Sequence, residues 1–222
     1  MSYMGERLEA AARLLKTENN TLFADIGSDH AFLAIEVIKR GIAKSAIAAD
    51  INEQPLLKGR ENAAMQGVAM NFILSDGFKS LEEHSVTSAA VCGMGGELIA
   101  RIVLESSICK SALLVLQPMS AQEILRKALW DNGFDILTEA FVIDSGKPYT
   151  VMQVKYGKQT AQYSYTDLYL GKERPRTAEF LAYCEKQLNS ALKRKIGIIA
   201  RGESTEDIDA LISYCQTQTT SF

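Results

Sequence analysis

The sequence predicts a doubly wound α/β fold, in which a parallel sheet of seven strands is covered by helices on both faces. Short apolar runs such as Ala112–Leu116 suit strands that are buried on both sides of a parallel sheet. These runs alternate with longer segments of helical periodicity, and this alternation implies right-handed crossovers. We therefore expect a Rossmann-like domain over residues 1–157.

The predicted elements follow one another in a regular order. A first helix rests on the apolar residues Leu8, Ala11, Ala12 and Leu15. Strands are then predicted at 22–26, 45–50, 69–74, 88–92 and 112–116, and helices at 31–40, 53–66, 97–105 and 121–131. Two closing strands, 134–143 and 149–156, have no helix between them, which indicates a hairpin that adds an antiparallel strand at the edge of the sheet.

The pattern changes beyond a polar stretch at residues 157–166. Apolar residues then recur at steps of three and four, as on one stripe of a helix: Leu181, Cys184, Leu188, Leu192, Ile196 and Ile199. Gly202 ends this helix, and a second apolar series marks another helix after it. We expect an antiparallel, coiled-coil-like hairpin of two helices over residues 158–222. A hairpin of this size is marginal alone, so it should pack on the α/β body or on a partner.

The composition is that of an ordinary globular protein, with 47% hydrophobic and 23% charged residues and a formal net charge of −3. No apolar run approaches the roughly 18 residues of a membrane span, and the N-terminus does not resemble a signal peptide. The four scattered cysteines and two histidines predict neither a zinc site nor a disulfide framework. We expect a cytoplasmic protein without a metal. From residue 155 onward 10 basic residues stand against 8 acidic ones, which is a weak hint of a polyanionic partner.

The first predicted strand ends in an acidic turn, Asp25-Ile26-Gly27-Ser28-Asp29-His30. Ligands of doubly wound sheets bind at the carboxyl ends of the strands, near the point where strand order reverses. The Gly-x-Gly-x-x-Gly of dinucleotide enzymes is absent, and two carboxylates suit a cationic or zwitterionic ligand better than a phosphate. A plain strand-to-helix turn remains an alternative for Asp25 and Gly27, and a helix N-cap remains one for Asp29.

The next two strands also end in acids. Asp50 could hold a ribose diol, although it or Asn52 could instead cap the helix that starts near Glu53. Asp76, followed by Gly77, could accept a hydrogen bond from an adenine amino group, although an Asp-Gly pair is equally common in ordinary turns.

The fourth strand ends in Cys92-Gly93-Met94-Gly95-Gly96, with three glycines in four residues. Such a segment permits close approach of a ligand or of another part of the chain. The order of acidic turn, acid, acid and glycine loop on one sheet predicts a pocket for S-adenosylmethionine.

These motifs resemble the class I methyltransferases and, more closely and over essentially the whole chain, the bacterial tRNA (adenine-22-N1)-methyltransferase family, TrmK. The run Gly-Met-Gly-Gly followed by Gln-Pro is rather specific to this family, whereas the Asn/Asp-Pro-Pro-aromatic motif of general amino-methyltransferases is absent. The resemblance rests on residues 25–31, 49–50, 75–77, 92–96 and 117–119. It implies methylation of N1 of adenine 22 in the D-loop of bacterial tRNA, with S-adenosylmethionine as the methyl donor.

The resemblance also implies a set of cofactor contacts. The methionine end would lie at Asp25, Gly27 and Asp29, the ribose at Asp50 and the adenine at Asp76 and Gly77. A partly buried histidine at a helix start is the alternative for His30. The full predicted set is Asp25, Gly27, Ser28, Asp29, His30, Asp50, Ile51, Asn52, Asp76, Gly77, Cys92, Gly93, Met94 and Gly95.

Methylation of adenine N1 needs little acid–base chemistry, because neutral adenine already offers the N1 lone pair. We therefore expect catalysis mainly by positioning. The base must be unpaired or flipped out. Positioning roles are predicted for Asp29, Gly93, Met94 and Tyr149. Ser28, Gln117 and Tyr149 are candidates to hold or stack the base, with a strand residue of the closing hairpin as the alternative for Tyr149.

Contacts to the wider tRNA need positive charge, and the C-terminal part of the chain supplies it. A solvated helix face is the alternative for any single one of these basic residues. The predicted substrate-binding residues are Gln117, Pro118, Lys172, Arg174, Arg176, Lys186, Lys193 and Arg194.

Three other functions remain open from the sequence. The same pocket could serve a methyltransferase acting on a small molecule or a protein, with the hairpin as a lid or dimer contact. A degenerate Rossmann module that only binds a partner protein is a second alternative. An NAD dehydrogenase ranks last because the phosphate loop is missing. A monomer is favoured.

Overall fold

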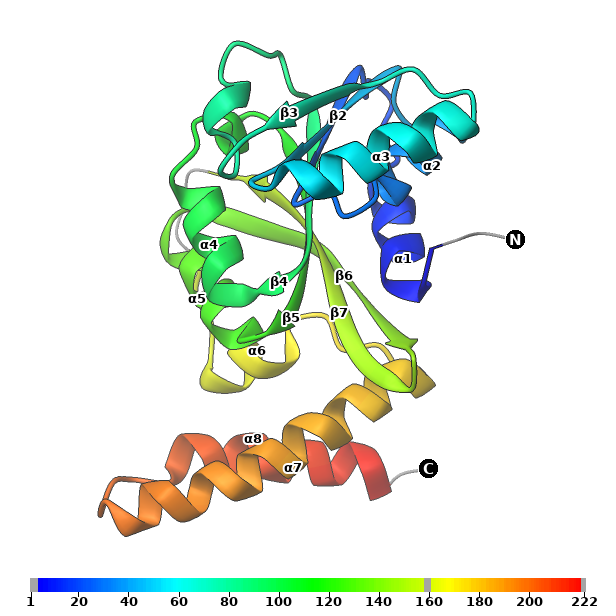
Figure 1. Ribbon diagram of the computed structural model, residues 1–222. Coiled ribbons are helices and arrows are strands. Elements are labelled where there is room, and N and C mark those ends of the chain that lie inside the picture. The colour runs from blue at the N-terminus through cyan, green and yellow to red at the C-terminus, as the bar shows by residue number, and fades with distance from the viewer. Residues whose placement is uncertain (1–3, 158–160, 221–222) are drawn as a thin grey trace.

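The structure, a computed structural model, describes residues 4–157 and 161–220. Its strands are β1 (Leu22–Ile26), β2 (Ser45–Asp50), β3 (Asn71–Leu74), β4 (Ser88–Gly95), β5 (Leu113–Ser120), β6 (Phe134–Asp144) and β7 (Lys147–Tyr156). Its helices are α1 (Glu6–Leu14), α2 (Phe32–Lys39), α3 (Glu53–Met65), α4 (Gly96–Leu104), α5 (Gln122–Asp131), α6 (Tyr165–Leu170), α7 (Ala178–Ala200) and α8 (Glu206–Thr220). Two short 3-10 turns, η1 (Lys79–Leu81) and η2 (Ile108–Lys110), complete the chain order. Figure 1 shows the sheet at the centre, with α7 and α8 beyond it.

The strands form one seven-stranded sheet in the order β3-β2-β1-β4-β5-β7-β6, which confirms the predicted Rossmann-like fold. Strand order reverses between β1 and β4, so the ligand-binding crevice is expected at their carboxyl ends. The closing hairpin differs from the prediction in one respect. Its antiparallel strand β7 pairs with β5 and lies second from the edge, and β6 forms the edge. In the inner strand β7, Val151, Met152 and Val154 are fully buried, whereas Leu137 of the edge strand β6 is 47% exposed.

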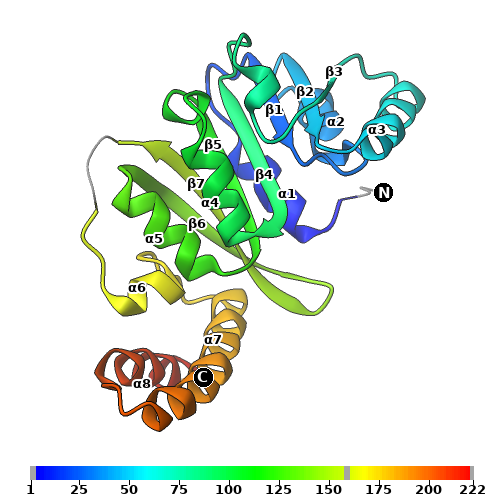
Figure 2. The same cartoon turned by 60° about the vertical axis from the view of Figure 1, so that its left-hand side comes forward.

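Helices cover the sheet on both faces, as Figure 2 shows. Helices α1 and α2 pack on one face and α4 and α5 on the other, and each helix pair has its own buried apolar cluster with the strands. Side chains alternate between the faces along a strand. The alternation therefore places Asp25, Cys92 and Gln117 on the face covered by α1 and α2.

Two strands run further than predicted, and this changes the surroundings of the glycines. Strand β4 continues to Gly95 with register irregularities after Cys92 and Met94, so the predicted glycine loop is the end of a strand. A Cβ atom on Gly96 would lie 2.2 Å from the carbonyl oxygen of Ala121. Gly96 is therefore required by close packing of α4, which confirms the structural alternative for this glycine. Strand β5 likewise continues to Ser120.

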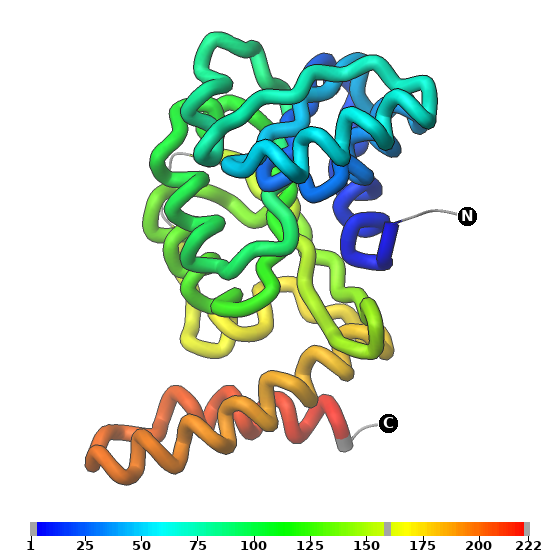
Figure 3. The backbone as a smooth tube through the Cα atoms, in the orientation of Figure 1, coloured from blue at the N-terminus to red at the C-terminus, as the bar shows by residue number. Residues whose placement is uncertain are grey.

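The C-terminal helices α7 and α8, here called the arm, form an antiparallel pair below the sheet (Figure 3). The apolar series predicted the helix α7 and, with Cys184 and Leu188, the first part of its buried side, but not the last part. Leu192, Ile196 and Ile199 are 43%, 71% and 59% exposed, whereas Phe180, Tyr183 and Ala191 are buried against β6 and α8. The short helix α6 precedes the arm and was not predicted. A capping box between Ser164 and Asp167 stabilises its start.

The described residues contain neither a candidate membrane-spanning helix nor a candidate metal cluster. Among residues 4–157 and 161–220, no helix is long and apolar enough to cross a membrane. In the same described ranges, no group of three or more His, Cys, Asp or Glu side chains could hold a metal ion.

Candidate active site

Two adjoining cavities lie at the carboxyl ends of the parallel strands. The larger has a volume of about 530 Å³ and the smaller about 190 Å³. Both are lined by Arg7, Gly27, Asp29, Cys92 and Gly93. Of the other predicted cofactor residues, the larger cavity brings together Asp50, Ile51, Asn52, Asp76, Gly77 and Met94, and the smaller one takes in Asp25 and Ser28. Neither cavity is lined by His30 or Gly95.

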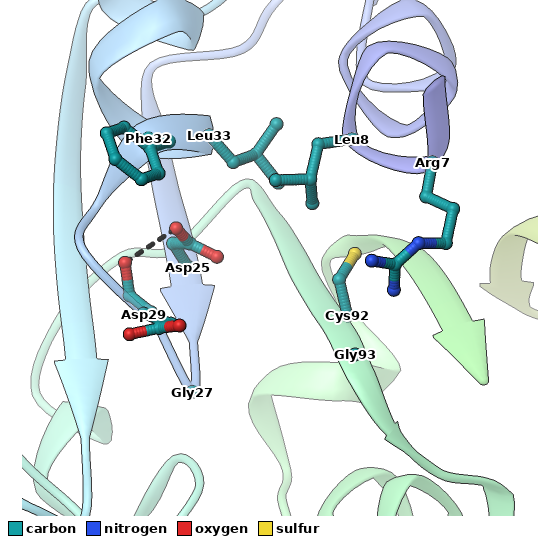
Figure 4. Close-up of a pocket in the computed structure, with 10 residues that line it drawn as sticks. Arg7, Leu8, Asp25, Gly27, Asp29, Phe32, Leu33, Cys92 and Gly93 are labelled. Atoms are coloured by element: carbon teal, nitrogen blue, oxygen red, sulfur yellow. Dashed lines mark hydrogen bonds between the residues drawn. The ribbon is translucent and has the colours of Figure 1, made fainter. Parts of the chain in front are cut away.

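The smaller cavity has walls of opposite charge. Figure 4 shows Asp25 and Asp29 on the side of β1, and Arg7 with Cys92 on the opposite side. The Ser28 hydroxyl donates a hydrogen bond of 2.7 Å to Asp25 Oδ2, so Ser28 is turned toward this carboxyl group. Burial raises the pKa of Asp25 to about 6, although the Ser28 hydrogen bond opposes this shift. A cation that enters the cavity would therefore gain a carboxylate partner close to neutral pH.

Arg7 of α1 is the site residue that the sequence did not reveal. Its Nε donates to Asp144 Oδ2 at 2.6 Å, and its Nη1 donates to Gln117 Oε1 at 3.1 Å. Its guanidinium carbon lies 5.0 Å from the centre of the Tyr149 ring. Arg7 sits in a short charged segment near the N-terminus, and its sequence neighbours do not show that α1 crosses the ends of β5 and β7.

Asp50 belongs to the turn between β2 and α3. Its Oδ1 accepts a hydrogen bond of 2.8 Å from the backbone N–H of Asn52, and Asn52 occupies the N-cap position without a capping side-chain bond. The alternative of a side-chain cap is therefore wrong for both residues. One oxygen of Asp50 holds the turn, and the residue also lines the larger cavity.

Asp76 and Gly77 form a turn, as the alternative interpretation predicted, and this turn also lines the larger cavity, so the adenine contact stays a prediction. Gly77 has a φ of +61°, which favours glycine. The Asp76 carboxylate pairs with Lys79 at 2.5 Å and lies 3.9 Å from Arg101. The hydrogen bond from Lys79 lowers the pKa of Asp76, so this carboxylate stays ionised.

The turn after β1 corrects two expectations. Ala31, in the left-handed region, is the N-cap of α2, so the N-cap alternative for Asp29 is wrong. The Asp29 side chain is 80% exposed and lies 3.2 Å from His30 Nε2. His30 has a φ of +61° and its ring stacks on Phe32 with 5.6 Å between ring centres. His30 therefore fits the alternative of a partly buried histidine at a helix start better than a cofactor contact.

Two residues predicted to hold the acceptor base are buried instead, and so is Pro118, which was predicted to bind the substrate. Gln117 is fully buried, Pro118 is buried beside it in β5, and Tyr149 is 8% exposed. The physical reason is the greater length of β5, which turns the Gln117 side chain toward α1. There Gln117 Oε1 also accepts a hydrogen bond of 3.2 Å from the backbone N–H of Gly93. The predicted base contacts of these residues are therefore wrong, and the strand alternative for Tyr149 is right.

The six basic residues predicted to meet tRNA divide into two groups. Lys172, Arg176 and Lys193 are exposed, although the Lys172 ammonium also lies 5.0 Å from the centre of the Trp130 ring. The other three are engaged within the protein: Arg174 pairs with Asp167, Lys186 donates to Pro148 O at 3.1 Å, and the Arg194 guanidinium lies 4.0 Å from the Tyr169 ring centre.

Comparison with known proteins supports the interpretation of this site. A methyltransferase domain family matches residues 4–152. The chain is 27% identical over 172 residues to the tRNA (adenine(22)-N(1))-methyltransferase of Bacillus subtilis (strain 168). The matched region covers 76% of this chain and 71% of that protein. The chain is 31% identical over 163 residues to a Mycoplasma pneumoniae protein named "Putative tRNA methyltransferase", covering 72% of this chain and 75% of that protein.

Solved structures agree with the fold over the whole chain. A Streptococcus pneumoniae chain described as a "putative tRNA (m1A22) methyltransferase", solved in complex with S-adenosyl-L-methionine, is 29% identical with a TM-score of 0.81. The similarity covers 96% of this chain and 98% of that one. The B. subtilis m1A22 tRNA methyltransferase TrmK, at 23% identity, shares the fold with a TM-score of 0.78 over 99% of this chain and 97% of its own.

The doubly wound sheet, with acids at the ends of its strands and glycines in their turns, defines a Rossmann-like methyltransferase. More particularly, the chain belongs to the methyltransferase domain family and, within it, to the TrmK family of tRNA methyltransferases.

Proposed function

We propose that this protein transfers a methyl group from S-adenosylmethionine to N1 of adenine 22 in tRNA. One observation carries the proposal: the larger cavity brings together Asp50, Asp76, Gly27 and Gly93 at the strand ends, in a chain that resembles a structure solved with S-adenosyl-L-methionine. The cavity volume of about 530 Å³ falls in the range of ordinary small-molecule sites.

The chemistry of the residues fits the cofactor. The methionine end of S-adenosylmethionine is a zwitterion, and the smaller cavity offers the guanidinium of Arg7 opposite the carboxyl groups of Asp25 and Asp29. We assign the ribose hydroxyls to Asp50 and the adenine to the turn at Asp76 and Gly77. His30 and Gly95 are left out of this set because neither lines a cavity.

When bound, S-adenosylmethionine supplies an electrophilic methyl group on a sulfonium. The protein's own part is to hold the acceptor base in line and to exclude water. Positioning alone can contribute about 7–11 kcal/mol in favourable systems. The methylated base carries a positive charge, and the exposed Asp29 carboxylate is placed to stabilise it. Gly93 and Met94 would form the floor beneath the base. No residue has to remove a proton before the attack.

We assign the tRNA contacts outside the cavities to the exposed Lys172, Arg176 and Lys193. Phosphate contacts of this kind position the RNA rather than read its sequence.

We further propose that the enzyme acts in the cytoplasm as a monomer. In its domain organisation, residues 1–157 would carry the chemistry and residues 158–222 would contact tRNA; residues 158–160, at this boundary, lie outside the described residues.

The experiment offers labelled S-adenosylmethionine with unmodified tRNA, a protein extract or a small-molecule extract as acceptor. We expect label in the tRNA, and in 1-methyladenosine after digestion to nucleosides. Label only in the protein or the small-molecule fraction would overturn the tRNA assignment and favour the alternative acceptors. A parallel calorimetric titration with S-adenosylhomocysteine tests the cofactor assignment without any acceptor.

A further inference from the structure

A chain of contacts begins where the arm meets the closing hairpin. Lys186 of α7 donates to Pro148 O, and its Nζ lies 5.2 Å from the centre of the Tyr149 ring. The Arg7 guanidinium carbon lies 5.0 Å from the centre of the same ring. The Tyr149 ring is therefore in contact with two cations, one from the arm and one from α1.

The contacts continue from Arg7 to the floor of both cavities. Gln117 Oε1 accepts hydrogen bonds from Arg7 Nη1 at 3.1 Å and from the Gly93 backbone N–H at 3.2 Å. Asp144 holds the other side of Arg7 at 2.6 Å. Gly93 has a φ of +79° and lines both cavities. Arg7 and the Gly93 peptide therefore share one acceptor, Gln117 Oε1.

The residues in the middle of this series of contacts are shielded from solvent, so the positions of their side chains are restricted. Gln117 is fully buried and Tyr149 is 8% exposed. Lys186 is half-buried, and its Nζ also lies 5.9 Å from the centre of the Tyr183 ring. Cation–π contacts strengthen when the cation loses water. A lysine held by a carbonyl and two rings is poorly placed to bind a phosphate.

We propose that Tyr149 and Lys186 are positioning residues for methyl transfer. They hold Arg7 and, through Gln117, the Gly93 peptide, so the seating of the arm on the β6–β7 hairpin sets the geometry of the cavity floor. For Tyr149 the role agrees with the positioning role that the sequence predicted but acts through Arg7 instead of by base stacking, and for Lys186 it replaces the predicted phosphate contact. The proposal rests on the proposed function, since the reaction measured is methyl transfer to tRNA.

The main test replaces Lys186 by methionine, which keeps the apolar stem and removes the ammonium. At saturating tRNA and cofactor, Lys186→Met should lower the single-turnover rate about tenfold, leaving the KM for tRNA and the salt dependence of binding unchanged. Lys186→Arg should restore most of the rate. Lys195→Met, on the same helix but paired with Asp209 of α8 at 2.6 Å, is the matched control and should stay within about twofold of wild type. A raised KM with an unchanged rate would overturn the proposal in favour of a phosphate contact.

Variants of Tyr149 and Arg7 test whether Lys186 acts on the cavity floor through these two residues. Tyr149→Phe keeps the ring and should leave the rate close to wild type, whereas Tyr149→Leu should reproduce the loss seen with Lys186→Met. If Lys186 acts through Arg7, the double variant Arg7→Lys/Lys186→Met should be no slower than the slower single variant. Effects that multiply in the double variant would mean that the two residues act independently, which contradicts the proposal.

A spectroscopic readout separates this proposal from the proposed function. In ¹H–¹⁵N spectra of the full chain, the Gly93 amide resonance should shift in Lys186→Met and stay in place in Lys195→Met. An unmoved Gly93 resonance in Lys186→Met would refute the coupling of Lys186 to Gly93 even if the wild-type protein methylates tRNA. Conversely, the wild-type protein could methylate no tRNA while the Gly93 resonance still shifts in Lys186→Met. That result would refute the proposed function and leave the coupling of Lys186 to Gly93 standing.

Discussion

Asp25, the proposed partner of the cofactor's ammonium group, opposes stability when it is ionised. Its carboxyl group is buried, and its pKa rises from 3.8 to about 6 because burial disfavours the charged form. By linkage, the ionised group destabilises the folded state by about 3 kcal/mol above pH 7. Asp25→Asn should therefore raise the free energy of unfolding at pH 8 by about 1–3 kcal/mol. The gain should shrink between pH 6 and pH 4, where Asp25 takes up its proton. Urea denaturation at several pH values measures this, and a variant less stable at pH 8 would contradict the account.

The same carboxyl group predicts how cofactor affinity depends on pH. Below pH 6 the cofactor's ammonium has to displace a proton from Asp25, so the Kd for S-adenosylhomocysteine should rise by up to about tenfold per pH unit. Calorimetry between pH 5 and pH 8 checks this. Asp25→Asn should bind more weakly at pH 8 and should lose the pH dependence. A slope that survives in the variant would assign the titration to another group.

Site residues could be predicted from the sequence where the end of a strand fixes the position of the residue and its side chain indicates the chemistry. Asp25, Asp50 and Asp76 end neighbouring parallel strands, so their order along the chain predicted that they would share one edge of the sheet. The sequence did not predict Arg7 as a site residue, because its place depends on how α1 crosses the sheet. The base contact predicted for Gln117 was wrong because β5 runs to Ser120, and strand ends are the least certain part of a sequence pattern.

At the scale of elements, the contact of α4 with the β5–α5 turn depends on the absence of one side chain. A Cβ atom on Gly96 would lie 2.2 Å from the Ala121 carbonyl oxygen, so Gly96→Ala should destabilise the protein by about 1–3 kcal/mol. Gly95→Ala is the matched neighbour, because its Cβ atom would meet only Ser120 Oγ at 3.5 Å. Thermal unfolding compares the two variants, and an equal Tm would show that α4 shifts without cost.

A buried ion pair fixes α5 to the closing hairpin. Arg126 Nη2 lies 2.8 Å from Glu139 Oε1, and both side chains are almost fully buried. Arg126→Met would leave the Glu139 carboxylate without its partner, and we expect a loss of about 3–5 kcal/mol. The double variant Arg126→Met/Glu139→Gln should recover part of this loss. Lys127→Met removes only exposed contacts, the pair with Asp131 and those with Tyr163, and should leave the Tm nearly unchanged. Similar losses for Arg126→Met and Lys127→Met in denaturant titrations would contradict this account.

The elements themselves were largely predictable from periodicity. The predicted strand 22–26 agrees with β1 and the predicted helix 121–131 with α5 to within a residue, because turn residues bound buried runs there. Helix α6 is too short to show a period. In α7, Ile196 and Ile199 of the apolar series remain exposed, whereas Ile198, which the series did not include, packs with residues of α8. Periodicity indicates that a helix is amphipathic, but the partner elements decide which residues they cover.

For the whole molecule, an acidic protein has to hold a polyanion through a few exposed cations. Lys193 of the arm is exposed. If it meets a phosphate, Lys193→Met should weaken tRNA binding and reduce the slope of log Kd against log salt by about one. Filter binding between 50 and 200 mM salt measures the slope. Lys195→Met provides the comparison on the same helix, and an unchanged slope in Lys193→Met would remove Lys193 from the tRNA footprint.

The central claim is methylation of N1 of one adenine, and primer extension on tRNA tests it most directly. A methyl group on N1 blocks Watson–Crick pairing and therefore stops reverse transcriptase. We predict a strong stop at adenine 22 after incubation with the enzyme and S-adenosylmethionine. The stop should be absent without the cofactor and absent in a transcript with guanine at position 22. A full-length product from a transcript that has nevertheless taken up label, or a stop at a different position, would contradict the account.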